Sequence, residues 1–371
     1  TYFHEADSAL GFVELNDPGA IHDARSFQRA ASKINFAFNW SYVGPDGIAY
    51  YLSGWYPERA KRTSPDFPIL GTGAYDWQSF DPGTHTMKLV PFSRHPRAIN
   101  PRYLVSWNNK QAPGWAAADD KWSYGPLFRS HMLERRVRRA IKGRRKARLE
   151  QLVQAMEEPA TQDIRAVELL PTLLRALGKP KDPKLREAIG LLRSWRAAGG
   201  HRRDLNRDGH YDDDGAVTLM DAWWPKLVAA EFQGTLGNEV FDRVESMLAL
   251  GDPKGGAGDA PAFSDGWWGY VSKDLRDLYG PRPKGRWSRV YCGSGSRTRC
   301  RLALQFSLKE ALSVRKADLY GKEPSCAGTP EASCHDMNRF TIASGISQPP
   351  FPFQNRPTFQ QVVEIMGPAS R

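Results

Sequence analysis

The stretch NFAFNWSYVGPDGIAYYL, residues 35–52, decides the fold of this chain. Aromatic side chains take every second position in its first half, at Phe36, Phe38, Trp40 and Tyr42. An extended segment with this period is aromatic on one face and carries small or polar residues on the other. Residues 44–47 (GPDG) favour a turn, and 48–52 return to an apolar pattern. The stretch therefore predicts a β-hairpin.

The segments around this hairpin complete a strand-rich first third. Residues 23–33 (DARSFQRAASK) predict a short helix ahead of it. Residues 57–101 are rich in Pro and Gly and predict a long loop, which in a compact protein is usually functional or held by a ligand. Residues 103–107 (YLVSW) predict a short strand that ends at Asn108 and Asn109.

A helical pattern replaces the strand pattern from residue 127. Apolar residues at helical spacing form two stripes separated by a break near Gly143: Phe128, Leu133, Val137 and Ile141, then Leu149, Leu152, Val153 and Met156. Further helices are predicted over residues 167–177, 185–197 and 216–232. Residues 252–259 (DPKGGAGD) predict a low-complexity loop, and the tail from Arg286 predicts short strands and loops.

These patterns predict an α+β protein with three regions. Residues 1–126 form the strand-rich part, and residues 127–250 form the helical part. Residues 251–371 form loops and strands that return to the core.

Composition indicates a globular chain with a large core. The chain has 371 residues, of which 40% are hydrophobic and 25% are charged. It contains no run of 18 apolar residues, so we expect no membrane span. The net charge is +11, and ten of the twenty residues 129–148 are Arg or Lys. This run lacks interleaved aromatic residues and any known motif, so we interpret it as a solvated helix face and expect no nucleic-acid partner.

Four cysteines occur late in the chain, in two close pairs. Cys292 and Cys300 lie eight positions apart, as do Cys326 and Cys334. Four cysteines allow three connectivities, of which two local disulfides are the simplest. Disulfides imply an oxidising compartment, so we expect a periplasmic or extracellular protein. The spacing does not suit a zinc site.

The segment LVSWNNK, residues 104–110, resembles the oxyanion-hole strand of penicillin acylases, and Pro113 and Asp119 follow it as in that family. Four other stretches match the family in the same order: FNW at 38–40, DGIAY at 46–50, PDFPILGTG at 65–73 and NRPTFQQ at 355–361. The resemblance therefore covers nearly the whole chain.

The resemblance implies an N-terminal-nucleophile hydrolase with an αββα sandwich of antiparallel sheets. Enzymes of this family are made as a precursor that cuts itself, and the freed N-terminal Ser of the larger chain attacks an amide. By this resemblance the chain is the C-terminal part of the catalytic chain, and the Ser lies upstream of it. The implied partner is the upstream half of the same precursor, and the isolated piece is expected to be inactive. Penicillins, acyl-homoserine lactones and related N-acyl compounds are the implied substrates.

Three residues take functional roles from the resemblance. Asn108 would donate a side-chain hydrogen bond to the oxyanion, which is worth about 3–4 kcal/mol in acyl transfer. Arg129 would support that site, and Phe38 would shape the acyl pocket. The alternatives are a turn residue for Asn108, a solvated helix residue for Arg129 and a core aromatic for Phe38.

Two calcium sites are predicted. The resemblance implies that a carbonyl of Pro65 and a carboxylate of Asp119 bind one Ca²⁺, together with upstream ligands. Independently, residues 204–212 (DLNRDGHYD) are similar to the start of an EF-hand loop, with candidate ligands at Asp204, Asn206, Asp208, His210 and Asp212. Position twelve of that loop is Gly215, where the motif has Glu, so an ion-free acidic turn is the alternative.

Two other functions remain alternatives to the amidase. One is a non-catalytic, calcium-stabilised extracellular binding module with an aromatic groove. The other is a nucleic-acid binder built on residues 129–148.

Overall fold

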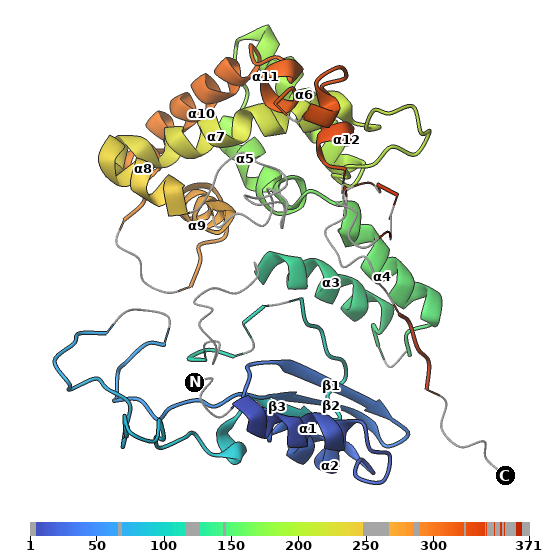
Figure 1. Ribbon diagram of the computed structural model, residues 1–371. Coiled ribbons are helices and arrows are strands. Elements are labelled where there is room, and N and C mark those ends of the chain that lie inside the picture. Colours follow the sequence, from blue (N-terminus) through green and yellow to red (C-terminus); the bar gives the residue numbers. More distant parts are fainter. Residues whose placement is uncertain are drawn as a thin grey trace. The chain divides into compact units, whose positions relative to one another are not determined.

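The computed structural model confirms an α+β chain with a small antiparallel sheet and many helices (Figure 1). It describes residues 5–65, 69–107, 109–110, 112–115, 127–143, 146–247, 267–284, 289–322, 324–337, 339, 345, 349–350, 352 and 361–365. The chain divides into two compact units, which we call the first unit (residues 1–153 and 361–371) and the second unit (residues 154–360).

The sheet belongs to the first unit and confirms the predicted hairpin. Its strands are β1 (Asn39–Gly44), β2 (Gly47–Leu52) and β3 (Arg97–Ile99), in the order β1-β2-β3. Both pairings are antiparallel, with Tyr42 opposite Ala49 and Tyr50 opposite Ala98. Gly47 turns the hairpin at φ 130°, a backbone conformation that favours glycine. β1 begins four residues later than the start of the aromatic stretch.

Two short helices accompany this sheet, with a 3-10 turn before them. They are η1 (Glu5–Asp7), α1 (Ser8–Leu15) and α2 (Ala24–Ala31). The helix predicted at 23–33 is confirmed as α2, and Asp23 caps it. The Asp23 carboxylate accepts from the Ser26 N–H at 2.7 Å, and the Ser26 hydroxyl oxygen accepts from the Asp23 N–H at 2.9 Å. This reciprocal pair satisfies backbone groups that the first helical turn leaves open.

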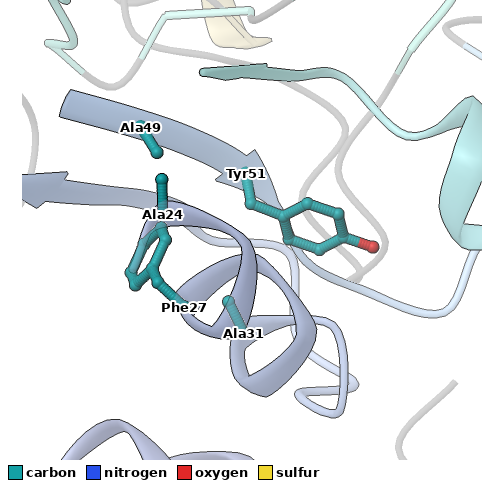
Figure 2. Packing of buried hydrophobic residues seen from close by; sticks show 5 residues of the cluster. All are labelled: Ala24, Phe27, Ala31, Ala49 and Tyr51. Atoms are coloured by element: carbon teal, nitrogen blue, oxygen red, sulfur yellow. The ribbon is translucent and has the colours of Figure 1, made fainter. Parts of the chain in front are cut away.

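The core of the first unit forms where α2 packs on the hairpin. Ala24, Phe27 and Ala31 of α2 lie against Ala49 and Tyr51 of β2 (Figure 2). Trp40 and Tyr42 pack on the edge of this cluster, so the aromatic face of β1 serves partly as core. Alternating residues point to one side of a strand, and this is why the period-2 pattern located the buried face.

Two helices account for the two predicted stripes of apolar residues. They are α3 (Leu127–Ala140) and α4 (Leu149–Thr161). Gly143 lies between them at φ 74°, which ends the first helix where the sequence predicted a break. The loop predicted at residues 57–101 contains a 3-10 turn, η2 (Phe92–Arg94).

The strand predicted at residues 103–107 is wrong. These residues carry no strand assignment, and no described strand supplies the ladder of hydrogen bonds that a strand needs. Side-chain bonds to α3 hold the segment instead, as described below.

The second unit is helical. Its elements are a π-helical turn η3 (Arg165–Leu169), α5 (Leu170–Leu177), α6 (Pro183–Ala197), α7 (Asp214–Leu236), α8 (Asn238–Met247), α9 (Trp267–Tyr279), η6 (Cys292–Gly295), α10 (Arg297–Ala311), α11 (Lys316–Tyr320), η7 (Pro324–Cys326) and α12 (Ala332–His335). The predicted helices at 167–177, 185–197 and 216–232 are confirmed. α7 has 23 residues and lies beside α10 (Figure 1), with Trp223 and Trp224 fully buried.

The prediction of strands after residue 286 is wrong for residues 292–335, where the described residues form helices and turns; most of the tail beyond residue 339 lies outside the described part. Cys300, Leu304, Leu308 and Ala311 are buried at intervals of four, four and three residues, which is the period of a helix face rather than a strand. Ser296 caps the N-terminus of this helix, α10, through the Arg299 N–H.

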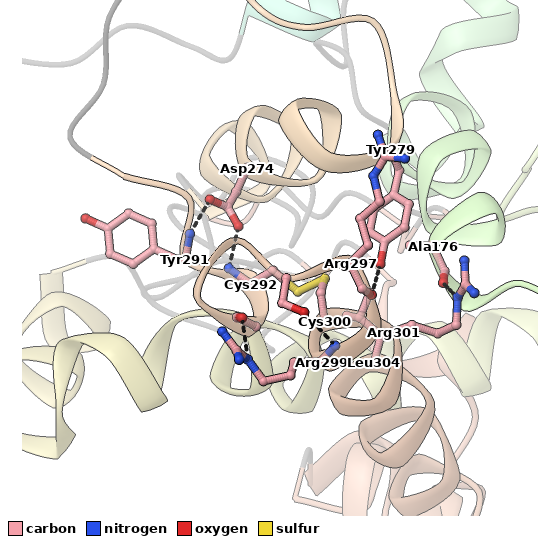
Figure 3. The surroundings of a disulfide bond; sticks show 12 residues. Ala176, Asp274, Tyr279, Tyr291, Cys292, Arg297, Arg299, Cys300, Arg301 and Leu304 are labelled. Carbon is pink, nitrogen blue, oxygen red and sulfur yellow. Dashed lines mark hydrogen bonds between the residues drawn. A yellow bond between two sulfur atoms is a disulfide. The ribbon is translucent and has the colours of Figure 1, made fainter.

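Both predicted local disulfides are present. Cys292 is bonded to Cys300, and Cys326 is bonded to Cys334. The first joins the η6 turn to α10 (Figure 3). No helix among the described residues combines the length and apolar character needed to cross a lipid bilayer.

A buried ionic network lies inside the second unit. Arg165 and Arg202 are paired with three carboxylates, those of Asp163, Asp221 and Asp336. Burial alone would raise the pKa of Asp221, but the two guanidinium groups hold it well below its usual range. The hydroxyls of Tyr211 and Tyr320 donate to Asp336 and Asp221. Charges removed from water are tolerated only when paired in this way.

Candidate active site

Phe38 lies in a row of aromatic rings at the entry to β1. Its ring centroid is 6.1 Å from that of Phe36 and 5.8 Å from that of Trp40, and Trp40 makes an edge contact with Phe12 of α1 at 5.8 Å. Phe38 is 48% exposed. A half-exposed ring in an aromatic row offers an apolar surface to a ligand, so Phe38 is available for the predicted role in substrate binding.

Ser53, which the sequence did not single out, fixes this row. The fully buried hydroxyl of Ser53 donates to the Phe36 carbonyl at 2.6 Å. Its oxygen accepts from the Phe38 N–H at 3.2 Å and from the Trp40 indole N–H at 2.9 Å. One side chain therefore sets the positions of three successive aromatic residues of the row. Ser53 follows directly after β2, and only the pairing of β1 with β2 brings it to the other strand.

The segment that leads to Asn108 is fastened to α3. The Tyr103 hydroxyl donates to the Glu134 carboxylate at 2.5 Å, and this bond, together with burial, raises the pKa of Tyr103. The Arg102 guanidinium donates to the carbonyls of Ile141 and Gly143 at the end of α3. A cation is favourable there because the last carbonyls of a helix lack partners and carry partial negative charge.

The described residues after Asn108 make contacts with other parts of the first unit. The Asn109 carboxamide oxygen accepts from the Trp107 N–H at 3.0 Å. Trp115 then packs on Tyr56 at 4.8 Å and on His95 at 5.3 Å. His95 stacks on Tyr51 of β2 with an interplanar angle of 3°. The chain around position 108 is thus tied to α3 before it and to the sheet after it.

Some predicted site residues lie outside the described part of the chain. Asn108 and Asp119 are among them, and for Arg129 the structure describes the backbone of α3 but not the side chain. Arg129 belongs to the first turn of α3, the helix to which Arg102 and Tyr103 bind. The described contacts of Arg102 and Tyr103 are with Glu134 and with the residues that follow α3, not with the first turn that carries Arg129. Pro65 is half-buried, and the residue after it is outside the described part.

The predicted calcium loop is a compact acidic turn between α6 and α7. Asp204 accepts from the N–H groups of Asp208 and Gly209 at 3.2 and 2.8 Å. Asp208 accepts from the His210 N–H at 2.9 Å, and this bond lowers the pKa of Asp208. The Asp212 carboxylate accepts from the Leu205 N–H at 3.1 Å. The carboxylates of Asp204, Asp208 and Asp212 are thus bound to backbone N–H groups of the loop itself.

Other contacts direct parts of this loop away from a common centre. The His210 imidazole lies 3.3 Å from the Glu331 carboxylate, and the Asn206 amide donates to Asp208 at 2.8 Å. Among the described residues, no group of three or more His, Cys, Asp or Glu side chains is placed to hold a metal ion. The donor set consists mainly of hard oxygens, which suits calcium, and the loop lacks a bidentate Glu.

Comparison with known proteins identifies the family. The family model described as penicillin amidase matches residues 1–359 of the chain. The chain belongs to the penicillin amidase family. This confirms the family inferred from the LVSWNNK segment and the stretches around it.

A solved structure has a similar fold. The chain is similar to a thermostable penicillin G acylase from Alcaligenes faecalis, with a TM-score of 0.63 and 20% sequence identity. The match covers 95% of this penicillin amidase family chain and 60% of that acylase chain. At this identity the likeness shows the fold, and the chain spans about three fifths of the length of its structural relative.

Proposed function

We propose that this chain is part of an amide hydrolase that removes the acyl group from an N-acyl compound such as a penicillin or an acyl-homoserine lactone. The family match over residues 1–359 carries the proposal. The contacts of the described residues on either side of Asn108, which are Arg102 and Tyr103 with α3 and the residues after it, and Trp115 with Tyr56 and His95, support it. A donor that stabilises an oxyanion must be held rigidly, since its value comes from being oriented before the charge develops.

The proposed mechanism divides the work between this chain and an upstream segment of the same precursor. The upstream segment supplies the N-terminal Ser, whose α-amine acts as the base. Attack of the Ser hydroxyl on the amide carbonyl forms a tetrahedral oxyanion, to which the Asn108 carboxamide donates a hydrogen bond. Arg129 adds positive potential, and Phe38 contacts the acyl group. Collapse releases the amine, and water then releases the acid.

Calcium is part of the same proposal. Hard oxygens of Pro65 and Asp119 would complete an ion site with upstream ligands, and the 204–212 loop would hold a second ion through Asp204, Asn206 and Asp208. In both places the ion would pin loops rather than take part in the chemistry. We also propose a periplasmic or extracellular location, which the two disulfides favour.

The test begins with the full reading frame that encodes this chain. The protein should be purified after expression to an oxidising compartment, and the N-termini of its chains should be determined by mass spectrometry. The proposal predicts a chain that begins with Ser and that hydrolyses a chromogenic N-acyl anilide. A protein that binds N-acyl compounds but never cleaves them would instead support the non-catalytic binding module.

A further inference from the structure

We propose that Glu231 of α7 and Asp274 of α9 share one proton and form an alkaline-sensitive latch. The latch would hold α7, α9 and the disulfide turn η6 together. All of its parts belong to the second unit, whereas Phe38, Asn108 and Arg129 belong to the first.

The position of Asp274 is fixed by the backbone of the disulfide turn. Its two carboxylate oxygens accept from the N–H groups of Tyr291 and Cys292, at 2.6 and 2.7 Å (Figure 3). Cys292 is bonded in turn to Cys300 at the start of α10. Asp274 is only 4% exposed. It is thus the acceptor that satisfies the first N–H groups of the turn, and two N–H donors favour its charged form.

Glu231 has no such donors. It is 2% exposed, and no N–H or hydroxyl group among the described residues donates to either of its carboxyl oxygens. The next residue, Phe232, packs on Trp267 and Tyr291, with ring centroids at 5.5 and 5.3 Å, so aromatic rings help to cover this part of α7. A carboxylate left without donors in such a place is costly, and the group takes up a proton instead.

Asp274 is the group that Glu231 contacts. Two ionised carboxylates only accept hydrogen bonds and repel each other, whereas a carboxylic acid donates to a carboxylate. Burial, and next the Asp274 charge, raise the pKa of Glu231 well above its usual range. Burial also raises the pKa of Asp274, against the lowering effect of the two N–H donors. The shared proton therefore resides on Glu231, which donates to Asp274.

Many charged groups on the elements around the pair have partners of their own. On α9, Asp277 binds Arg282, and Arg276 donates to the Pro281 carbonyl. Asp221 of α7 is bound to Arg165 and Arg202, and Asp214 of α7 is bound to Lys316. Glu239 and Arg243 of α8 form an exposed pair, while Arg299, Arg301 and Lys309 of α10 bind Gly293, Ala176 and Asp182. The remaining charged residues of these helices are Lys226, Asp242, Glu245, Lys273, Arg297 and Glu310. Asp277 is the charged neighbour that acts on Asp274, and its sign disfavours ionisation further.

The sign of the pH dependence follows from the raised pKa. Above the ordinary Glu pKa of about 4.3, the unfolded chain has released this proton and the folded chain still holds it. Raising the pH therefore favours unfolding, until the pH passes the raised pKa of the folded state. One proton gives about a tenfold change in the unfolding equilibrium constant for each pH unit.

The test compares the protein with its Glu231→Gln variant by denaturant unfolding from pH 5 to pH 8. The Gln amide donates to Asp274 as the carboxylic acid does, but it cannot ionise. The ratio of the two unfolding constants should therefore change by about tenfold per pH unit, and the variant should become more stable relative to the unsubstituted protein as the pH rises. Glu239→Gln on α8 is the matched control, since Glu239 is 80% exposed, and its ratio to the unsubstituted protein should stay flat.

A flat ratio for Glu231→Gln overturns the proposal. Infrared spectroscopy of the unsubstituted protein provides the second readout, should the variant fail to fold. A protonated carboxyl C=O band at neutral pH that disappears as the protein opens at alkaline pH supports the shared proton. Absence of that band at neutral pH overturns it.

Discussion

Arg202 offers the sharpest test of what holds the second unit together. Its guanidinium is 2% exposed and makes four hydrogen bonds to three carboxylates. Two go to Asp221, one goes to Asp163 and one goes to Asp336, at distances from 2.8 to 3.3 Å. Arg202→Met keeps most of the side-chain volume and removes the charge. It leaves Asp163 and Asp221 with Arg165 alone and deprives Asp336 of its arginine.

The expected cost follows from this geometry. Removing one partner of a buried ion pair destabilises by about 3–5 kcal/mol, because the other charge stays buried without compensation. For a unit of this size the midpoint of thermal unfolding should fall by roughly 6–20 °C, at about 2–4 °C per kcal/mol. Differential scanning calorimetry and urea unfolding at neutral pH would measure both quantities.

Two further variants separate the network from a general effect of the substitution. Arg203→Met changes the next residue, which is half-buried and outside the network, and should cost less than about 1 kcal/mol. Asp336→Asn combined with Arg202→Met should cost less than the sum of the single changes, with a coupling of about 0.5–3 kcal/mol. A cost for Arg202→Met as small as that of Arg203→Met would refute the reasoning.

Three further predictions concern other parts of the chain. Replacing Cys292 and Cys300 by Ser should lower the free energy of unfolding by about 2–3 kcal/mol, measured by urea unfolding with and without reductant. If reductant lowered the stability of the variant as much as that of the unsubstituted protein, this prediction would be contradicted. Ser53→Ala should lower the free energy of unfolding by about 1–3 kcal/mol, since it leaves the Trp40 indole N–H without its acceptor. It should also weaken substrate binding by displacing Phe38, and an unchanged KM would count against this positioning role. Terbium luminescence titrations should show one fewer bound ion in Asp204→Ala than in the unsubstituted protein, whereas an equal number of bound ions in both would contradict an ion site in the 204–212 loop.

Local signals in the sequence were enough for the elements with a regular period. The alternation in 35–52 and the GPDG turn predicted the hairpin, because strand side chains alternate and the turn residues set the reversal. The two helix stripes on either side of Gly143 were equally visible. The helix α10 was missed because its buried face is formed by Cys, Leu and Ala among charged residues. The sequence therefore carries only a weak helical period of apolar residues there.

The remaining features depend on residues that lie far apart in the sequence. Ser53 orients Phe38 only after β1 pairs with β2, and Arg202 meets Asp336 across 134 positions. The segment at 103–107 has the residues of a strand, but a strand also needs a neighbour to pair with. Family motifs gave the candidate site residues, whereas the contacts that fasten the Asn108 segment came from the fold.

The most direct test of the amidase proposal is the turnover of an N-acyl anilide by the processed protein carrying Asn108→Ala. The proposal predicts that the variant folds and is processed, binds substrate with similar affinity, and shows a kcat lower by about 10²–10³-fold. Asn109→Ala, at the neighbouring position, should retain far more activity. A kcat for Asn108→Ala equal to that of the unsubstituted protein would contradict the account.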